Sequence, residues 1–541
     1  MRHAHFFVVA ATLLSVSPTD AWSLDVVSPT KDGLVIGDTA RIIVHCGDAP
    51  TLHASIAGQS AGISWTRGAY GNGWVGDLKL PSKGDQAVTL EGQCGGTDVS
   101  EPLQFNNGIE KSVEVAEQVI ARFFSMNEED KLEWNWGPAI FLYPLLKIAP
   151  KSTHSAEYID YVARYHQRHI EKGLPKIEWA DRCPSALSAF DLAVKHGRGF
   201  AWPSVETVME WIATAKRNPL GSIDHLGYDN AQSFFFPSSI WVDSLMMWAV
   251  LTVKYGLRTD DDTLLSFGLE QPFIFASKLR QPYTGLYHHA WNIEAGQPYP
   301  ADNVPWLRGN GWVLVSLAEM LEEIGWGHDR YDALAALFVN LAEASLTRRQ
   351  PSGYWDTVVD NPGYAYEESS GSALLAYGYA KGTRLGLLSP KFRYYARDTF
   401  RAITARMKRR STGFTMEEIS IGTNPTNKVG YSLIPTDRNV AYGVGAFLLL
   451  ADELSGDSFG DSAPGADTQL GDEQVPVRAL DDGQSAGSCG CRQLGGRPPQ
   501  RGGLASLCLV GALAWSMRRR SSKRSTGRQS PVERPRPVLP G

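Results

Sequence analysis

Residues 309–325, GNGWVLVSLAEMLEEIG, and residues 330–346, RYDALAALFVNLAEASL, decide the fold. In both stretches apolar residues recur at three- and four-residue spacing, which indicates α-helices. The first helix is apolar over most of its surface, whereas the second has a polar face. The first should therefore be buried and the second should cover it. Because only a short polar loop separates them, we predict a helical hairpin.

The same pattern repeats on both sides of this pair, over residues 108–455. Ten further stretches have helical spacing, and with the first two they make six successive hairpins. They are residues 111–124, 139–149, 156–170, 185–197, 204–215, 238–256, 263–279, 369–386, 391–407 and 439–454. Six hairpins match a mainly α fold, the (α/α)6 barrel, in which apolar inner helices alternate with amphipathic outer ones. An α-solenoid is the competing arrangement, but no repeat motif of fixed period supports it.

The preceding region, residues 24–107, has a different character. Short β-rich runs such as RIIVHC (41–46) and QAVTLEGQC (86–94) alternate with turns that contain Gly or Pro, which favours a small β-sandwich. If the chain is exported, we expect a disulfide between Cys46 and Cys94, and two free thiols are the alternative. No catalytic group of residues stands out here, so we interpret this region as an accessory domain.

The N-terminus is typical of a secretory signal peptide over residues 1–23. Arg2 supplies a positive start, residues 6–16 form a short apolar run, and the small residues around Ala21 and Ser23 suit cleavage. A buried first strand is the alternative. We therefore expect the protein to be exported.

The C-terminus has two parts that lie outside the expected fold. Residues 456–488 are rich in Gly, Ser, Asp and Gln, as in a disordered linker. Residues 489–541 begin with a Cys-Gly-Cys motif, continue with a short apolar run and end with basic residues. This order resembles the C-terminal surface-sorting signal of myxobacterial exported proteins, which implies anchoring at the cell surface. A disordered basic tail that binds anionic surfaces is the alternative, as is a secreted protein.

The composition argues against two classes of function. The 541 residues carry a net charge of −6, whereas nucleic-acid-binding proteins usually carry a basic excess on one surface. No pair of cysteines and no His/Cys cluster has the spacing of metal ligands, so we expect no zinc site and no cofactor. The 16 Trp and 20 Tyr residues suit sugar rings as well as they suit a core.

The most informative polar residue is Asp243, in PSSIWVDSLMMWAV (237–250). Its neighbours are nearly all apolar, and desolvation of a carboxyl group disfavours the charged form. We therefore expect a raised pKa, which is what a general acid needs near neutral pH. An aspartate that caps a helix is the alternative.

Three further residues are candidates at the loops between helices. Asp181, in IEWADRCPSAL (177–187), precedes a proline and a helical pattern, so a helix cap is favoured over a functional role. His288 and His289 lie between aromatic residues in TGLYHHAWN (284–292). One of them could orient a sugar or a carboxylate, and the other could be structural.

The stretch PWLRGNGWVLV (305–315) combines an arginine with indoles and glycines. The guanidinium of Arg308 could hold a carboxylate bidentately, while Trp306 and Trp312 offer stacking faces. A structural Arg–Trp pair is the alternative. Trp136, in EWNWGPA (133–139), is either a sugar platform or a core residue.

These motifs together resemble a known enzyme family. IWVDSLMM (240–247), TGLYHHAW, WLRGNGWVLVSLAEMLE, the long stretch 352–388 and VAYGVGAFLLLADE (440–453) occur in the order seen in unsaturated uronyl hydrolases. These are glycoside hydrolase families 88 and 105, and the unsaturated rhamnogalacturonyl hydrolases look nearer. The resemblance covers roughly residues 112–453, which is nearly the whole helical region.

The resemblance implies an (α/α)6 barrel and a hydrolase that removes a Δ4,5-unsaturated uronic acid from lyase-generated oligosaccharides. The general acid/base falls on Asp243, which protonates C4 before water adds at C5, and the second aspartate falls on Asp181. His289 and Arg308 match residues that line the pocket.

Two further pocket positions depart from the family's pattern. Trp136 stands where relatives often have Tyr, and His225, which the resemblance also implies in the pocket, lies in a stretch, residues 221–237, that is longer than expected. Rhamnogalacturonan oligosaccharides are the first substrate implied. Other lyase products, or a glycan-binding protein without activity, are the alternatives.

Overall fold

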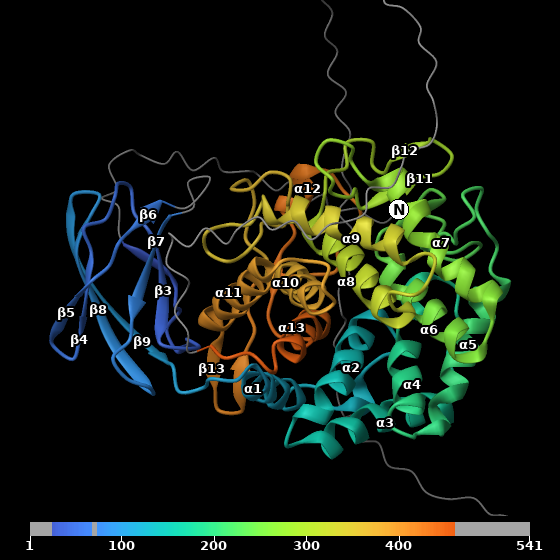
Figure 1. The fold of residues 1–541 in the computed structure, drawn as a ribbon, viewed down its shortest axis with the longest axis horizontal. Coiled ribbons are helices and arrows are strands. Elements are labelled where there is room, and N and C mark those ends of the chain that lie inside the picture. The colour runs from blue at the N-terminus through green and yellow to red at the C-terminus, as the bar shows by residue number, and fades with distance from the viewer. Residues whose placement is uncertain (1–23, 68–72, 460–541) are drawn as a thin grey trace, which may run out of the picture. The chain divides into compact units, whose positions relative to one another are not determined.

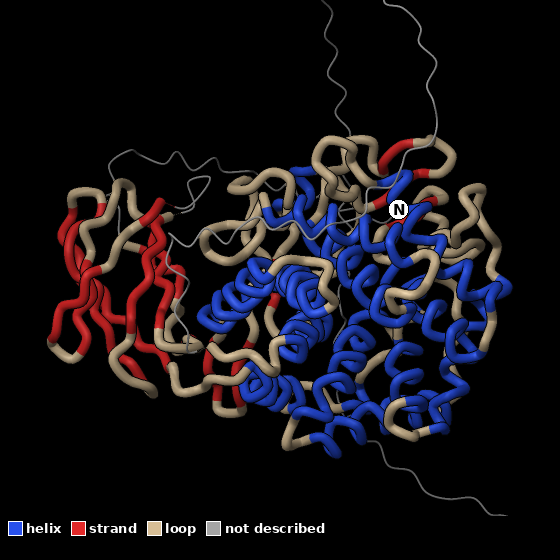
Figure 2. Tube along the Cα trace, viewed as in Figure 1, coloured by secondary structure: helices blue, strands red, loops and turns tan. Residues whose placement is uncertain are grey.

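The computed structural model describes residues 24–67 and 73–459, which form a β region followed by a helical region (Figures 1 and 2). The expected signal peptide, nearly all of the expected linker and the expected sorting tail lie outside these residues. Within the described part of the chain, no helix is both long and apolar enough to cross a lipid bilayer.

The β region is the small sandwich that the sequence predicts. One sheet has the strand order β1-β3-β7-β6 and the other β2-β9-β8-β4-β5, and their apolar side chains share one core. All pairs are antiparallel except β2 with β9. The strands are β1 (Asp25–Ser28), β2 (Gly33–Leu34), β3 (Thr39–His45), β4 (His53–Ile56), β5 (Gln59–Gly62), β6 (Thr66–Arg67), β7 (Trp74–Lys79), β8 (Asp85–Cys94) and β9 (Thr97–Asn106).

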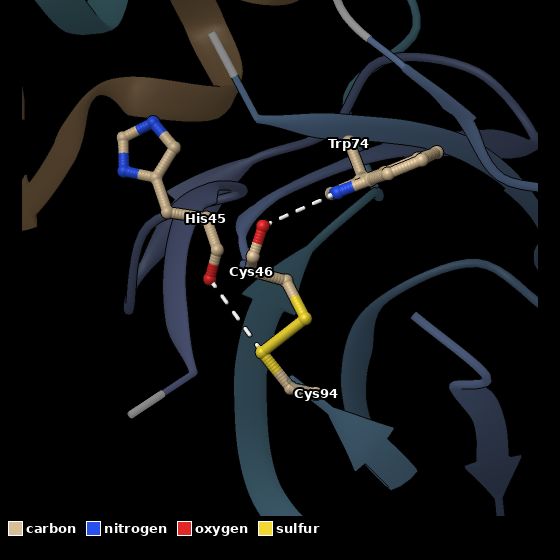
Figure 3. Close-up of a disulfide and its surroundings, with 4 residues drawn as sticks. All are labelled: His45, Cys46, Trp74 and Cys94. Carbon is tan, nitrogen blue, oxygen red and sulfur yellow. Dashed lines mark hydrogen bonds between the residues drawn. A yellow bond between two sulfur atoms is a disulfide. The ribbon is translucent and has the colours of Figure 1, made fainter. Parts of the chain in front are cut away.

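A disulfide joins the two layers of the sandwich (Figure 3). Cys46 follows β3 in one sheet and Cys94 ends β8 in the other, and their Cα atoms lie 5.4 Å apart. This is the pairing expected from the sequence. Beside it, Nε1 of Trp74 donates to the carbonyl oxygen of Cys46 at 3.3 Å.

The helical region is an (α/α)6 barrel, and each of the twelve expected stretches contains a helix. These helices are α1 (Ser112–Phe124), α2 (Trp136–Ile148), α3 (Ser155–Glu171), α4 (Ser185–Val194), α5 (Trp202–Thr214), α6 (Val250–Thr259), α7 (Asp262–Leu279), α8 (Leu307–Ile324), α9 (Tyr331–Leu346), α10 (Ser369–Arg384), α11 (Pro390–Arg406) and α13 (Ala441–Glu453). A short extra helix, α12 (Lys428–Ser432), precedes the last one.

Burial separates inner helices from outer ones, as the sequence predicts. In α8 every residue from Leu307 to Leu321 is buried, whereas α9, its outer partner, buries mainly one face. The inner helices pack in a ring: α13 contacts α2 and α10, α10 contacts α8, α8 contacts α6, and α2 contacts α4. An ion pair between Asp191 of α4 and Lys254 of α6, at 3.0 Å, connects the remaining two neighbours.

One expected helix is wrong in its first half. Residues 238–256 begin with strand β10 (Ser239–Trp241), which pairs with β11 (Ala290–Asn292), and β11 pairs in turn with β12 (Gln297–Pro298). A turn and one stretch of π-helix (Leu245–Ala249) then lead into α6. An apolar run fits a buried strand as well as a helix, so its periodicity cannot separate the two.

Two shorter strand pairings complete the loops. β13 (Lys408–Arg410) pairs with β14 (Gly413–Thr415), and β15 (Ile419–Ser420) pairs with β16 (Thr436–Asp437). The second pairing holds the chain between α11 and α13 beside the N-termini of the inner helices, because Ser420 bonds to Arg308 of α8 and to Glu368, the N-cap of α10.

A buried ionic cluster ties the inner helices together near their C-terminal ends. Glu319 of α8 is fully buried and lies 3.0 Å from Lys147 of α2 and 2.6 Å from Lys381 of α10. Tyr143 donates to the same carboxylate at 2.5 Å. Burial alone would raise the pKa of Glu319, but the lysines lower it well below its usual range. Cations near helix C-termini are also favoured by the helix dipoles.

The β region contacts the barrel through a partly buried ion pair. Arg41 of β3 lies 2.7 Å from both carboxylate oxygens of Asp398 in α11, and Arg349 contacts the same carboxylate. Burial opposes the charge on Asp398, yet the two arginines lower its pKa to about 2. Arg41 thus connects the accessory region to the outer helix α11.

Candidate active site

Most of the candidate residues, together with Glu368 and Tyr442, lie at the N-terminal ends of the inner helices. They lie at the start of α2 (Trp136), just before α4 (Asp181), just before the π-helical turn that leads into α6 (Asp243), at the start of α8 (Trp306 and Arg308), at the N-cap of α10 (Glu368) and in the first turn of α13 (Tyr442). The ionic cluster lies at the other ends of these helices. Helix N-termini carry partial positive charge, so this end of the barrel favours an anionic ligand.

Asp243 is held next to His289 by the pairing of β10 with β11. The amide of Val242 donates to the carbonyl of His289 at 2.9 Å, and Oδ2 of Asp243 lies 3.0 Å from Nε2 of His289. The Asp243 side chain is 14% exposed, so it faces both the histidine and solvent. Among the described hydrogen bonds it accepts none from the amides of the following turn, which argues against the helix-cap alternative.

The expected rise in the pKa of Asp243 is wrong for the unliganded protein. Burial does act in that direction, but the interactions with His289 and with nearby His225 outweigh it, and the pKa is lowered. Burial also lowers the pKa of His289, more than Asp243 raises it. At neutral pH the site therefore holds a carboxylate beside an uncharged imidazole.

Asp181 forms a second carboxylate–histidine pair. It lies in a short 3-10 helix (Ala180–Arg182), and its Oδ1 is 3.4 Å from Nε2 of His225. Nδ1 of His225 lies 3.0 Å from the hydroxyl of buried Ser244, the residue after Asp243. The Asp181 side chain is 26% exposed and makes no cap bond to α4 in the described residues. In the described residues Asp181 therefore does not cap α4, and its side chain contacts His225 instead.

A continuous band of rings connects the two pairs to the other candidates. Trp241 stacks on His225 with ring centroids 4.4 Å apart, and it meets His289 edge-on at 5.5 Å. The ring of His289 stacks in turn on Trp306 at 4.4 Å. These contacts fix both imidazole planes and therefore the direction in which each histidine meets its carboxylate.

The band continues to Trp136 through Arg308. The guanidinium lies 4.5 Å from the ring of Trp306 and 4.9 Å from the ring of Tyr442. Tyr442 stacks on Trp136 at 4.4 Å, and Trp136 is only partly buried. Trp136 is thus the ring of this band that is best placed to meet a sugar face.

Arg308 does not present a free fork to a ligand, so the carboxylate-clamp expectation is wrong for this structure. Its side chain is 1% exposed. One terminal nitrogen donates to the carbonyl oxygen of Ser420 at 2.9 Å, and the other donates to that of Ile421 at 2.9 Å. The structural Arg–Trp pair describes it better, because Arg308 positions the chain that follows β15.

Trp312 and His288 lie apart from the pair of carboxylates. Trp312 is fully buried among core side chains one turn deeper in α8 than Arg308, so the expected stacking face is wrong. His288 faces Gln281, with 3.3 Å between side-chain nitrogens. Of the two adjacent histidines, His289 therefore contacts Asp243, whereas His288 contacts Gln281.

Besides Trp241 and Tyr442 of the ring band, four residues of the site were missed by sequence reasoning. The buried carboxylate of Glu368 accepts from the amides of Ser370, Gly371 and Ser420 at 2.7–3.0 Å and so joins α10 to β15. Ser244 contacts His225, and the other two residues, Tyr431 and Asn303, stand behind His289. Glu368 had a signal, since it precedes the first residues of a helical pattern, whereas the others are ordinary loop or helix residues in the sequence.

The chain is similar in sequence to known glycan-degrading enzymes. The family described as Glycosyl Hydrolase Family 88 matches residues 111–455. The unsaturated rhamnogalacturonyl hydrolase YesR of Bacillus subtilis (strain 168) is 25% identical over 347 residues, which cover 64% of this chain and 95% of that protein. An unsaturated 3S-rhamnoglycuronyl hydrolase of Alteromonas sp. (strain LOR) is 26% identical over 220 residues, 40% of this chain and 50% of that protein.

Solved structures share the fold. A family 105 glycoside hydrolase of C. acetobutylicum ATCC 824 has a TM-score of 0.57 at 21% identity, covering 63% of this chain and 98% of that one. The unsaturated glucuronyl hydrolase of Bacillus sp. GL1 has a TM-score of 0.52 at 17% identity, covering 64% and 95%. The similarity in both cases lies in the barrel architecture.

Proposed function

The chain belongs to glycosyl hydrolase family 88, and we propose that it removes a Δ4,5-unsaturated uronic acid from the non-reducing end of lyase-generated oligosaccharides. One observation carries this proposal. A partly exposed carboxylate, Asp243, lies 3.0 Å from a buried histidine at the mouth of the barrel. A second carboxylate, Asp181, stands beside it with a histidine of its own.

The proposed reaction begins at the double bond and not at the anomeric carbon. Asp243 transfers its proton to C4, and the electron pair of the C4–C5 double bond forms the new C4–H bond. The cation left at C5 is stabilised by the ring oxygen. Water then adds to C5 and gives a proton back to the Asp243 carboxylate, which acts as general base. The pair of carboxylates that flanks the glycosidic bond in most glycosidases is not needed.

The hydration product then rearranges and releases the sugar chain without attack by an enzyme nucleophile. The hemiketal at C5 opens by cleavage of its bond to the ring oxygen, which takes a proton and leaves a ketone at C5. The hemiacetal that this creates at C1 then loses the remaining sugar chain as an alcohol. One water molecule is consumed, and Asp243 ends in the protonation state in which it began.

Asp243 has to gain a proton as the substrate binds, because its pKa is lowered in the unliganded protein. The uronate brings a negative charge into the site, and a nearby like charge raises the pKa of a carboxyl group. The sugar also displaces water from the exposed part of Asp243, which acts in the same direction. The convergent helix N-termini offset part of the repulsion between the two anions.

Rhamnogalacturonan oligosaccharides are the substrates that we propose first. Support comes from the relative YesR, whose name specifies an unsaturated rhamnogalacturonyl substrate and which the match covers almost completely. Products of other lyases that end in an unsaturated glucuronyl residue are the second choice.

A panel of lyase-digested polysaccharides tests the proposal. Purified protein is mixed with each digest, and loss of the ultraviolet absorbance of the C4–C5 double bond is followed. The wild type should consume at least one digest, and Asp243→Asn should not. Asp160→Asn, at an exposed position on the outer helix α3, serves as the control and should keep full turnover. Binding of digests without any loss of absorbance would instead support a glycan-binding protein.

We also propose that the protein is exported and held at the cell surface. The support comes from residues 1–23 and 489–541, and from the Cys46–Cys94 disulfide, a bond typical of oxidising compartments. Protease treatment of intact cells tests this idea. A surface protein should be degraded under those conditions, whereas an internal one should survive until the cells are lysed.

A further inference from the structure

The Nδ1 side of His289, which faces away from Asp243, contacts a group of buried polar residues. Its Nδ1 lies 3.0 Å from the hydroxyl oxygen of Tyr431 in α12. Tyr431 and His289 are completely buried, and Asn303 beside them is 4% exposed. Groups this deeply buried cannot exchange their hydrogen bonds for bonds to bulk water, so the arrangement of their protons is set by their neighbours.

The orientation of Asn303 follows from a backbone group. Its Oδ1 accepts from the backbone amide of His289 at 2.9 Å, and an amide N–H can only donate. Nδ2 of Asn303 is therefore the nitrogen that faces Tyr431, at 2.8 Å, and it also donates to the carbonyl of Thr426 at 2.7 Å. The side-chain amide cannot be turned around without losing all three bonds.

The hydroxyl proton of Tyr431 then has one remaining hydrogen-bond acceptor. The phenolic oxygen already accepts from Nδ2 of Asn303 and from the amide of Thr426, at 3.3 Å. Among the contacts described, Nδ1 of His289 is the acceptor that remains for its O–H. A protonated Nδ1 would place three donors around one oxygen and leave the phenolic proton without an acceptor.

We propose that Tyr431, oriented by Asn303, is a positioning residue that fixes His289 as the tautomer with its proton on Nε2. Nε2 of His289 lies 3.0 Å from Oδ2 of Asp243. This role rests on the proposed function. As Asp243 gives its proton to C4, negative charge develops on the carboxylate, and the Nε2–H donor of His289 is already in place to stabilise it. Tyr431 itself touches neither the substrate nor Asp243 in this arrangement.

Two substitutions disturb the tautomer in different ways. Tyr431→Phe removes the hydroxyl and leaves Nδ1 of His289 without a donor. Asn303→Asp keeps an acceptor for the His289 amide but replaces the Nδ2 donor with a second acceptor, which should draw the Tyr431 proton away from His289. Tyr379→Phe is the matched control, because Tyr379 is also fully buried and its hydroxyl lies 2.8 Å from Ser345, far from the site between α9 and α10.

The tautomer is measured directly by nitrogen NMR on the full chain with ¹⁵N-labelled histidine. Long-range proton–nitrogen spectra distinguish a protonated ring nitrogen from an unprotonated one, and the signals that vanish in His289→Gln assign the residue. The wild type at neutral pH should show a protonated Nε2 and a bare Nδ1. A protonated Nδ1 in the wild type would overturn the proposal, whatever the enzyme does with sugars.

Kinetics supply the second readout. Tyr431→Phe should lower kcat by about 10- to 100-fold, because the Nε2–H donor of His289 to the charged Asp243 is no longer fixed, with a much smaller change in KM. The alkaline limb of its kcat profile should move to higher pH, because the Asp243 carboxylate loses a donor that stabilises its charged form. Asn303→Asp should reproduce both changes, and Tyr379→Phe neither.

The outcomes separate this proposal from the proposed function. Wild-type kcat with an unmoved pH profile in both Tyr431→Phe and Asn303→Asp would refute the positioning role while leaving the hydrolase assignment intact. A wild type that consumes no lyase product would refute the function, and with it the role in catalysis, even if the spectra show the expected tautomer.

Discussion

Removal of Lys381 tests whether the ionic cluster holds the inner helices together. Its Nζ lies 2.6 Å from Glu319 and 2.7 Å from Glu322, and the side chain is completely buried. Lys381→Met keeps most of the side-chain volume but leaves the charge of Glu319 with fewer partners. Breaking a buried ion pair from one side costs about 3–5 kcal/mol. Because Lys147 and Tyr143 still contact Glu319, we expect about 3 kcal/mol.

The assay is thermal unfolding at neutral pH. A barrel of this size has an unfolding entropy near 0.7 kcal/mol/K, so the expected loss lowers Tm by about 4 °C. Lys195→Met is the control, since Lys195 also pairs with a buried carboxylate, Asp191 at 3.0 Å, but is 50% exposed. An exposed pair is worth less than about 1 kcal/mol, or roughly 1 °C here. Equal Tm shifts in the two variants would refute a special role for the cluster.

Three further predictions concern the loops, the sandwich and Arg308. Burial, with Glu367 nearby, raises the pKa of Asp356 to about 7, so its protonated form favours folding, and stability should fall as pH rises from about 4 to about 7. Asp356→Asn should remove that fall in stability, which is at most about 4 kcal/mol for a three-unit shift in pKa. Tm is measured against pH for both proteins, and a slope in the variant equal to that of the wild type would contradict the prediction. Replacing Cys46 and Cys94 with serine should destabilise the β region by about 4 kcal/mol, because the disulfide closes a loop of 48 residues. Denaturant unfolding of the wild type is compared with and without reductant, and identical curves would contradict this prediction. Arg308→Lys should lower kcat and the Tm together, since it loosens the chain after β15, and a change confined to KM would revive the carboxylate clamp.

The helices of the barrel were predictable because burial imposes a period on the sequence. Each inner helix meets apolar neighbours all round, and each outer helix meets them on one face, so both patterns can be read without knowing the partner. Strand β10 was not predicted by this reasoning. A buried strand followed by a buried helix reads as one apolar run, and what decides the matter is a pairing partner, β11, about fifty residues further on.

The candidate site was predictable in its members but not in its electrostatics. Apolar neighbours in the sequence suggested a raised pKa for Asp243, yet the residue that decides it is His289, brought next to it only by the strand pairing. Arg308 looked available because its acceptors, Ser420 and Ile421, come from a distant segment. Trp312 shares the glycine-rich motif, but one turn of helix carries it from the mouth of the barrel into the core.

Proton delivery by Asp243 to C4 is the central claim, and a reaction in D₂O tests it most directly. NMR follows the double bond and the glycosidic bond of an unsaturated disaccharide at the same time. With the wild type, the double bond should disappear no later than the sugar is released, and one deuterium should be found on C4. Asp243→Asn should do neither. Release of the sugar while the double bond persists, or normal turnover by Asp243→Asn, would contradict the claim.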